Sequence, residues 1–414
     1  EDAEQVVKAH GLEMVFVPKG AFELGTVKSF TDRNNISTGR GSRTAPLDAF
    51  FTYNPEGTDG FGGVYKINNE SEISIGKQEG NLYYIDAVIP GTNTFSGDEE
   101  GKLEKDFPKG YQAFYQMKYE LSEQEYCDFL NSIPKAYAEQ RFNPQVVYQS
   151  KTKEAYRNTI NINEGVYKTT QPHRACNFLS WKDILAYADW ACLRPMTELE
   201  FEKSARGPKE AVWREFVWGV NEKKEGNFNY SSILFDPDGS IASTENGDEY
   251  TDGNAHVILL DYRDYQDVCD PEGEFYQPSY PNCRSLKGGD GGRGPLRKGI
   301  HGLRSKGDRI KAGASYYGAM DLGGNLQEPV VPVGSPFSRK YKGTHGDGEL
   351  NEYGEATNAD WNTQKAEDDV FGFRGGSWPY HENHARIADR FDTYRTGSVE
   401  RKPYRGFRGV RTVF

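Results

Sequence analysis

The chain has 414 residues, a formal net charge of −12 and a sequence pI near 5.3. This acidic balance argues against a nucleic-acid partner, which would call for a basic face. The sequence also lacks any run of about 18 apolar residues that could span a membrane. Only 36% of the residues are hydrophobic and 46 are glycine, which indicates a loop-rich fold rather than a helical bundle.

The first patterned segment, Gly11 to Gly25, reads as a strand, a turn at Pro18 to Gly20 and a second strand. This pattern predicts a hairpin. Residues 26–107 follow and are rich in Gly, Asn, Ser, Asp and Thr. Because so long a structureless loop is uncommon in a compact domain, we interpret this segment as a surface insertion. Its short β-like runs leave room for a small sheet of its own.

Three later segments begin with a capping pair and continue with apolar residues at helical spacing. The pairs are Ser122 with Glu125, Ser180 with Asp183, and Thr197 with Glu200. Each predicts a helix, and we interpret the acidic members as caps rather than catalytic groups. Residues 135–170 and 221–310 read as irregular, whereas Trp213 to Trp218 reads as a strand.

The C-terminal stretch from Phe373 to Arg411 begins with a glycine turn and ends with an alternating segment, Gly406 to Arg411. The alternation predicts a half-buried strand that is apolar on one face and charged on the other. Two strands joined by a long polar loop would hold that loop on a rigid sheet. Such an arrangement is typical of binding and catalytic surfaces.

Four motifs are candidates for nucleotide or metal binding. Residues 289–294 match a dinucleotide fingerprint but neither follow a strand nor open a helix. Residues 236–239 start like an EF-hand loop but lack its closing glutamate, so a turn fits better. His381 and His384 could reach one metal ion, although no third ligand stands at a fixed spacing. Asp321 to Glu328, DLGGNLQE, has two carboxylates that could close around a hard cation, with backbone carbonyls between them.

The five cysteines have no zinc-type spacing: Cys127, Cys176, Cys192, Cys269 and Cys283. Cys127 and Cys192 lie on apolar helix faces, where a free buried thiol is expected. Whether Cys269 and Cys283 form a disulfide stays open at this point.

Eight segments, in this order, resemble the formylglycine-generating enzyme (sulfatase-modifying factor) family. They are Met14–Gly25, Tyr119–Asn131, Asn177–Trp190, Leu193–Gly207, Trp218–Gly219, Gly318–Glu328, Phe373–Trp378 and Arg405–Arg411. The resemblance implies an α+β fold of C-type lectin-like type, with little regular secondary structure and with bound calcium. It also implies a single domain over residues 1–414, with insertions at about 26–107 and 230–310.

Carried over residue by residue, the resemblance implies two calcium sites. The first uses the side chains of Asp321 and Glu328 and the carbonyls of Gly324 and Leu326. Asp321 replaces a family asparagine, which keeps an oxygen ligand and adds a charge. The second site would use four residues of the longer insertion: Asn227, Phe228, Asp290 and Gly292.

The family's catalytic pair does not carry over. Its copper-dependent enzymes place two cysteines after the GGS motif, and the aligned residues here are Tyr380 and Ala385. Soft Cu(I) needs thiolate ligands, and the histidine-rich iron domain of the ergothioneine-type relatives is also absent from the sequence. The resemblance therefore implies a non-catalytic relative. The alternative is an oxidase that uses other ligands, such as His381 and His384 with a carboxylate.

We expect an extracellular or cell-surface binding or structural protein that engages a protein or a glycan. The chain starts at Glu1 without an apolar signal segment, as a processed or trimmed chain would. Its motifs resemble a branch common in Bacteroidetes surface, gliding-motility and type IX secretion proteins, which implies a possible large assembly. The predicted contacts in the 378–404 loop are Trp378, Tyr380, His381, Asn383, His384, Arg386, Arg390 and Tyr394. The arginines could instead pair with nearby acids inside the fold.

Overall fold

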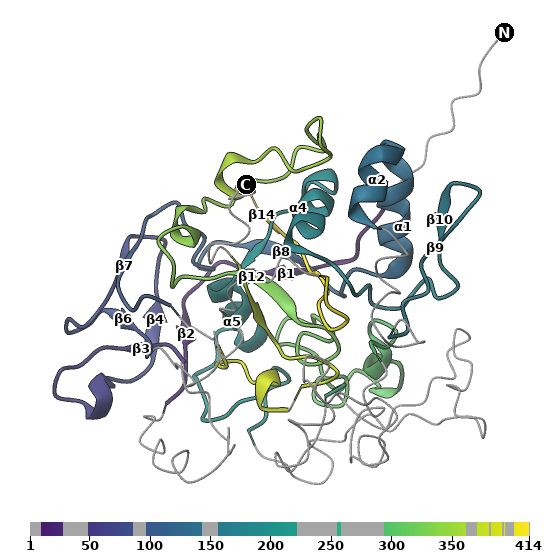
Figure 1. Cartoon of the computed structure of the whole chain (residues 1–414). Coiled ribbons are helices and arrows are strands. Elements are labelled where there is room, and N and C mark those ends of the chain that lie inside the picture. The colour runs from purple at the N-terminus through teal and green to yellow at the C-terminus, as the bar shows by residue number, and fades with distance from the viewer. Residues whose placement is uncertain are drawn as a thin grey trace, which may run out of the picture.

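The computed structural model describes residues 10–27, 49–85, 97–142, 156–221, 255–257, 294–361, 371–380, 382–390, 393 and 401–413. Several small sheets and short helices surround a shared core (Figure 1). This arrangement confirms the α+β class. Among the described residues, no helix is both long enough and apolar enough to cross a membrane.

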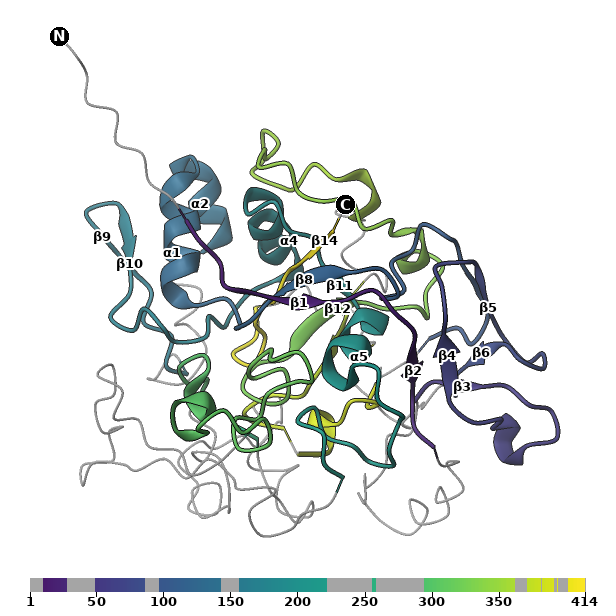
Figure 2. The same ribbon diagram turned by 180° about the vertical axis from the view of Figure 1, so that it is seen from behind.

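The central sheet joins the two ends of the described chain. Strand β8 (Phe114–Met117) lies between β1 (Met14–Val17) and β14 (Val410–Thr412), and both pairings are antiparallel. Figure 2 shows β1 and β8 running together across the molecule.

The predicted hairpin at residues 11–25 is wrong. Strand β2 (Phe22–Leu24) pairs with β4 (Tyr65–Ile67) and not with β1. The turn between β1 and β2 is held by outside partners, because the Gly20 amide donates to the Tyr111 carbonyl at 2.9 Å. Local turn chemistry therefore marks where the chain bends but not which strands pair afterwards.

A second sheet has the order β11 (Met196–Thr197), β12 (Glu328–Val331) and β13 (Gly372–Arg374). Strand β12 is parallel to β11 and antiparallel to β13. The two C-terminal strands, β13 and β14, thus belong to different sheets. The expectation that one sheet holds both ends of the loop between them is wrong.

All three capping predictions are confirmed. Helices α1 (Glu123–Ser132), α4 (Trp181–Trp190) and α5 (Glu198–Arg206) each begin with a complete capping box. The stretch predicted to be irregular contains helix α2 (Lys135–Arg141) and a hairpin of β9 (Asn161–Asn163) with β10 (Val166–Lys168). Residues 213–218 form turns and one isolated bridge, so the strand predicted there is wrong. Short 3-10 helices occupy Thr58–Gly60, Ile300–Arg304, Ser338–Lys340, Ala359–Trp361 and Glu382–Ala385.

The segment interpreted as an insertion does carry a sheet. Its order is β3 (Phe51–Thr52), β6 (Leu82–Tyr83), β5 (Ile73–Ile75) and β7 (Gly101–Leu103). Part of this sheet shares the main core, because Ile73, Ile75, Leu82 and Leu103 belong to the same apolar cluster as the inner faces of α1 and α4. Phe51 and Tyr83 belong to a smaller cluster of their own.

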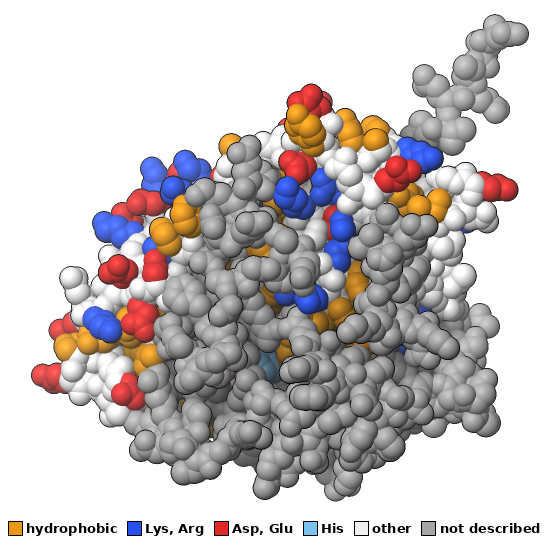
Figure 3. Space-filling view, in the orientation of Figure 1, with side chains coloured by type: hydrophobic (Ala, Val, Ile, Leu, Met, Phe, Trp, Pro, Cys, Tyr) orange, Lys and Arg blue, Asp and Glu red, His pale blue; other side chains and the backbone are white. Residues whose placement is uncertain are grey.

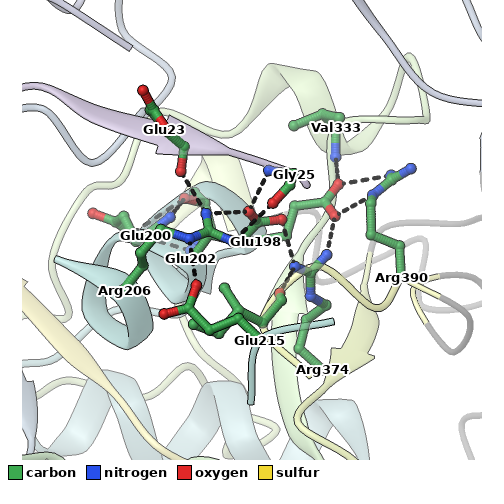
Figure 4. A network of polar contacts seen from close by, with 12 residues as sticks. Glu23, Gly25, Glu198, Glu200, Glu202, Arg206, Glu215, Val333, Arg374 and Arg390 are labelled. Atoms are coloured by element: carbon green, nitrogen blue, oxygen red, sulfur yellow. Dashed lines mark hydrogen bonds and ion pairs between the residues drawn. The ribbon is translucent and has the colours of Figure 1, made fainter. Parts of the chain in front are cut away.

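Helix α5 is a charged helix in the interior, with all nine residues buried. Figure 4 shows how its carboxylates are matched by arginines from distant segments. Glu198 binds Arg374 at 3.2 Å and Arg390 at 2.8 Å, and these three side chains have no exposed surface. Glu202 binds Arg374 at 2.7 Å. The network therefore joins α5 to β13 and to the segment that follows it.

Candidate functional site

The loop from Asp321 to Glu328 has an unusual backbone. Asp321 (φ 56°) and Asn325 (φ 57°) both adopt the left-handed conformation, which Asn and Asp tolerate better than most residues. Gly324 has φ 92°, and a Cβ atom there would lie 2.9 Å from the His256 carbonyl oxygen. These residue types allow the chain to fold tightly before it enters β12.

The loop collects oxygen atoms that have few partners within the protein. Asp321 is 4% exposed and Glu328 is 1% exposed. Glu328 Oε1 accepts a hydrogen bond from Arg408 Nε at 2.8 Å, whereas its Oε2 has no hydrogen-bond partner in the described chain. The carbonyls of Gly324 and Leu326 likewise accept no hydrogen bond from any described residue. Buried carboxylate and carbonyl oxygens of this kind fit a hard cation such as calcium.

The charges around the loop favour a cation. Glu120, with no exposed surface, lies close to Asp321 and Glu328, and burial together with these two acids raises its pKa well above the usual value. Burial also raises the pKa of Asp321 and of Glu328, an effect that the Arg408 guanidinium opposes. Three buried carboxylates thus face one guanidinium and the ring of His301. A divalent cation placed among them would favour their ionised forms.

Other metal sites find less support. In the described ranges, no group of three or more His, Cys, Asp and Glu side chains is placed to hold a metal. The Asp321 loop contributes only two carboxylates, and its other candidate ligands are backbone carbonyls, which such a group does not include. The residues of the second predicted calcium site, Asn227, Phe228, Asp290 and Gly292, lie outside the described residues.

The GGSW motif packs directly on this loop. Gly375 and Gly376 have φ values of 85° and 69°, and a Cβ on Gly375 would lie 2.5 Å from the Leu322 carbonyl oxygen. Only glycine fits there without strain. The Gly324 amide donates to the Gly375 carbonyl at 2.8 Å, and the Trp378 amide donates to the Asn325 carbonyl at 2.8 Å. The two motifs therefore form one structural unit.

The positions of the family cysteines are filled by aromatic and apolar packing. The Tyr380 ring meets the His384 ring at 5.5 Å and the Tyr404 ring at 5.4 Å. Ala385 has no exposed surface and belongs to the apolar cluster that contains Val217 and Leu322.

The described thiols are poor candidates for metal ligands. Cys127 and Cys176 are buried, and burial raises the pKa of Cys127 to about 12 and that of Cys176 above its usual value. A thiol kept protonated in this way is inert. Cys192 is half-buried just beyond the end of α4. Cys269 and Cys283, whose pairing the sequence leaves open, lie outside the described residues.

Three predicted ligand contacts are buried in the structure. Trp378 is 1% exposed and its Nε1 donates to the Pro403 carbonyl at 3.1 Å. Arg386 is 2% exposed and stacks on the Phe216 ring at 4.1 Å. Arg390 has no exposed surface. Its guanidinium pairs with Glu198 and lies over the rings of Phe50 and Tyr84 at 4.1 and 4.2 Å.

The described part of the 378–404 segment therefore differs from the exposed loop that was expected. Arginines and aromatic rings are useful at interfaces, but the same properties let them join layers inside a fold. His384 is also buried, and its Nδ1 lies 2.9 Å from Asp389 Oδ2. His381, the side chain of Asn383 and Tyr394 lie outside the described residues, so the proposed two-histidine site cannot be placed.

Two members of the loop site were missed by sequence reasoning. Glu120 follows β8, and Arg408 lies in the segment predicted to have one charged, solvent-facing side. Arg408 has no exposed surface, and besides Glu328 it binds the carbonyls of Met117, Lys118 and Met320. The signal that could have found both is their presence inside two of the family-like segments, Tyr119–Asn131 and Arg405–Arg411.

Comparison with known proteins finds a family model and a curated relative that match this chain. Residues 86–413 match the model of the sulfatase-modifying factor enzyme 1-like domain. The formylglycine-generating enzyme of Bos taurus is 27% identical over 165 residues, a match that covers 35% of this chain and 42% of that protein. The match thus spans less than half of that relative's length.

A solved structure, "Structure of PvdO from Pseudomonas aeruginosa", is 14% identical and has a TM-score of 0.33, with 97% of this chain and 94% of that chain covered. So low a score supports no argument about shared architecture. The family match, in contrast, covers most of the chain. This chain belongs to the sulfatase-modifying factor enzyme 1-like (formylglycine-generating enzyme) family.

Proposed function

We propose that this chain is a non-catalytic extracellular or cell-surface protein with a binding or structural role. In this proposal it uses a calcium-stabilised, C-type lectin-like version of the family fold. Its partner is a protein or a glycan, and it works as part of a surface assembly such as a secretion or gliding complex.

The observation that carries the proposal is the replacement of the two reactive thiols. Tyr380 packs between two aromatic rings, and Ala385 is sealed in an apolar cluster. A phenol and a methyl group cannot bind Cu(I) as thiolates do. The glycine turn and Trp378 nevertheless remain packed on the loop of Asp321 to Glu328. A scaffold kept without its reactive groups is expected of a relative that uses the fold for recognition.

The calcium part of the proposal rests on the oxygen set of the loop. Asp321 and Glu328 would supply side-chain oxygens, and Gly324 and Leu326 would supply carbonyls. The Glu328 Oε2 atom, which has no hydrogen-bond partner among the described residues, and the grouping of three buried carboxylates support this assignment. When bound, calcium would neutralise the buried acids of a loop that Arg408 already joins to the carbonyls of Met117 and Lys118.

Fewer of the predicted contact residues are available for binding a partner than the sequence suggested. Trp378, Arg386 and Arg390 are internal, whereas Tyr380 keeps part of its surface exposed. On the face shown in Figure 3, positive and negative side chains lie interspersed over the described surface. This pattern and the net charge of −12 fit a protein or glycan partner better than a polyanion.

Metal analysis of the purified protein tests the proposal. We expect calcium near one or two equivalents and no redox metal. The alternative, an oxidase with other ligands, predicts copper or iron near one equivalent, lost when His381 and His384 are both replaced by alanine. That result would overturn the non-catalytic assignment. Sizing of the native protein and identification of what co-purifies with it test the assembly.

A further inference from the structure

Glu120 is a buried acid that no ligand set above includes. It follows β8, has no exposed surface and is 206 residues away from the loop that it contacts. Its Oε1 accepts a hydrogen bond from the Leu326 amide at 2.9 Å, and its Oε2 accepts one from Asn325 Nδ2 at 2.5 Å. Both carboxylate oxygens are therefore directed at the middle of the candidate calcium loop.

Two backbone hydrogen bonds set the direction of the carbonyls that would bind the cation. In a planar trans peptide the C=O of one residue points opposite to the N–H of the next. The amide of Asn325 donates to the His256 carbonyl at 2.9 Å, so the Gly324 carbonyl points away from His256. The amide of Gln327 donates to the Tyr404 carbonyl at 2.9 Å, so the Leu326 carbonyl points away from Tyr404.

Glu120 holds the peptide unit between the Gly324 and Leu326 carbonyls, which joins Asn325 to Leu326. Its bond to the Leu326 amide turns the Asn325 carbonyl the opposite way, where that carbonyl accepts the Trp378 amide at 2.8 Å. Three consecutive amides, those of Asn325, Leu326 and Gln327, are thus anchored. Of the three anchors, only Glu120 is a side chain, and it is the only one that a substitution can remove without changing the backbone.

We propose that Glu120 is a positioning residue for calcium: it does not bind the ion but holds the Asn325–Leu326 peptide, and so fixes the spacing of the Gly324 and Leu326 carbonyls on either side of it. This inference rests on the calcium binding proposed above. A loop held in this way is preorganised, so that the ion finds its carbonyl ligands already in place. Glu120 also connects the ion site to the GGSW motif, since the same peptide unit bonds to Trp378.

The test is calcium affinity measured by competition with a chromophoric chelator, on the whole chain, for wild type and for Glu120→Gln. Glutamine keeps the size of the side chain but turns one acceptor into a donor that faces another donor. We expect calcium affinity to fall about 10- to 100-fold. Glu123→Gln is the matched control: it removes a buried acid three residues away, which bonds to Thr159 and Thr169 instead. Its calcium affinity should equal that of wild type.

The outcomes separate the two proposals. If wild type binds no calcium, the proposed calcium role fails and this inference fails with it. If wild type binds calcium and Glu120→Gln binds it equally well, only the positioning role of Glu120 is overturned. A merely structural role would lower the melting temperature without changing the affinity of the folded protein. If Glu120→Gln does not fold, Asn325→Gly removes the partner of Oε2 at a backbone position that glycine tolerates, and it should weaken calcium binding as well.

Discussion

Replacement of Arg390 by methionine tests whether this arginine stabilises the fold or serves to bind a ligand. Methionine preserves much of the side-chain volume but removes the guanidinium. Glu198 would lose its bonds to Arg390 at 2.8 and 3.0 Å and would keep only Arg374 and the Val333 amide. Breaking a fully buried ion pair by removing one partner costs about 3 to 5 kcal/mol, because the remaining charge is left without compensation.

We expect the free energy of unfolding to fall by about 3 kcal/mol, the lower end of that range, because Glu198 keeps two hydrogen-bond donors. In a chain of this size each kcal/mol lowers the melting temperature by about 2 °C, so we expect a decrease of about 6 °C. Differential scanning calorimetry measures it. The control is Lys135→Met, which removes an exposed i,i+4 pair with Glu139 and should change the midpoint by less than about 1 °C. If Arg390→Met melts together with this control, the argument for a structural arginine is refuted.

Three further outcomes are expected. Asp321→Asn should weaken calcium binding roughly tenfold by removing one ligand charge; an unchanged affinity in chelator competition would contradict the assigned ligand. Burial raises the pKa of Glu123 to about 7 from an ordinary 4.5, so its contribution is fully present below about pH 4.5 and is lost as pH rises to about 7. Between these two pH values the free energy of unfolding should fall by roughly 3 kcal/mol in denaturant unfolding, and Glu123→Gln should abolish this decrease. If the decrease persists in the variant, other groups cause it. Gly375→Ala should destabilise by more than about 2 kcal/mol, because its Cβ would strike the Leu322 carbonyl, whereas Gly11→Ala, with open space around it, should be near neutral in the same unfolding assay.

Features decided within a few residues could be predicted from the sequence. Ser122 with Glu125 is a complete capping box because both partners lie within one helical turn. The family motifs also pointed to Asp321 and Glu328, and the structure places these two carboxylates close together. Their role as calcium ligands stays a prediction.

Features decided by distant partners could not. The strand pattern at residues 11–25 gave no sign that β1 would pair with a strand some hundred residues away instead of with β2. Arg390 was predicted as a binding contact, with pairing to an acid inside the fold as the alternative. The structure bears out the alternative, and the acid that Arg390 meets lies 192 residues away. Glu120 is an ordinary acid in the sequence, and only the fold shows the amides that it binds.

The position of β8 between β1 and β14 has a consequence for biosynthesis. Strand β14 (Val410–Thr412) is synthesised long after β1 and β8, since Arg408, which precedes it, is 291 residues from Met117 in β8. Until then β8 has one free edge, and Arg408 cannot yet reach the carbonyls of Met117 and Lys118. Pairings across such long separations are slow to form. We therefore expect nascent chains that stop before residue 408 to be protease-sensitive and dependent on chaperones, with resistance appearing only when the final strand is released.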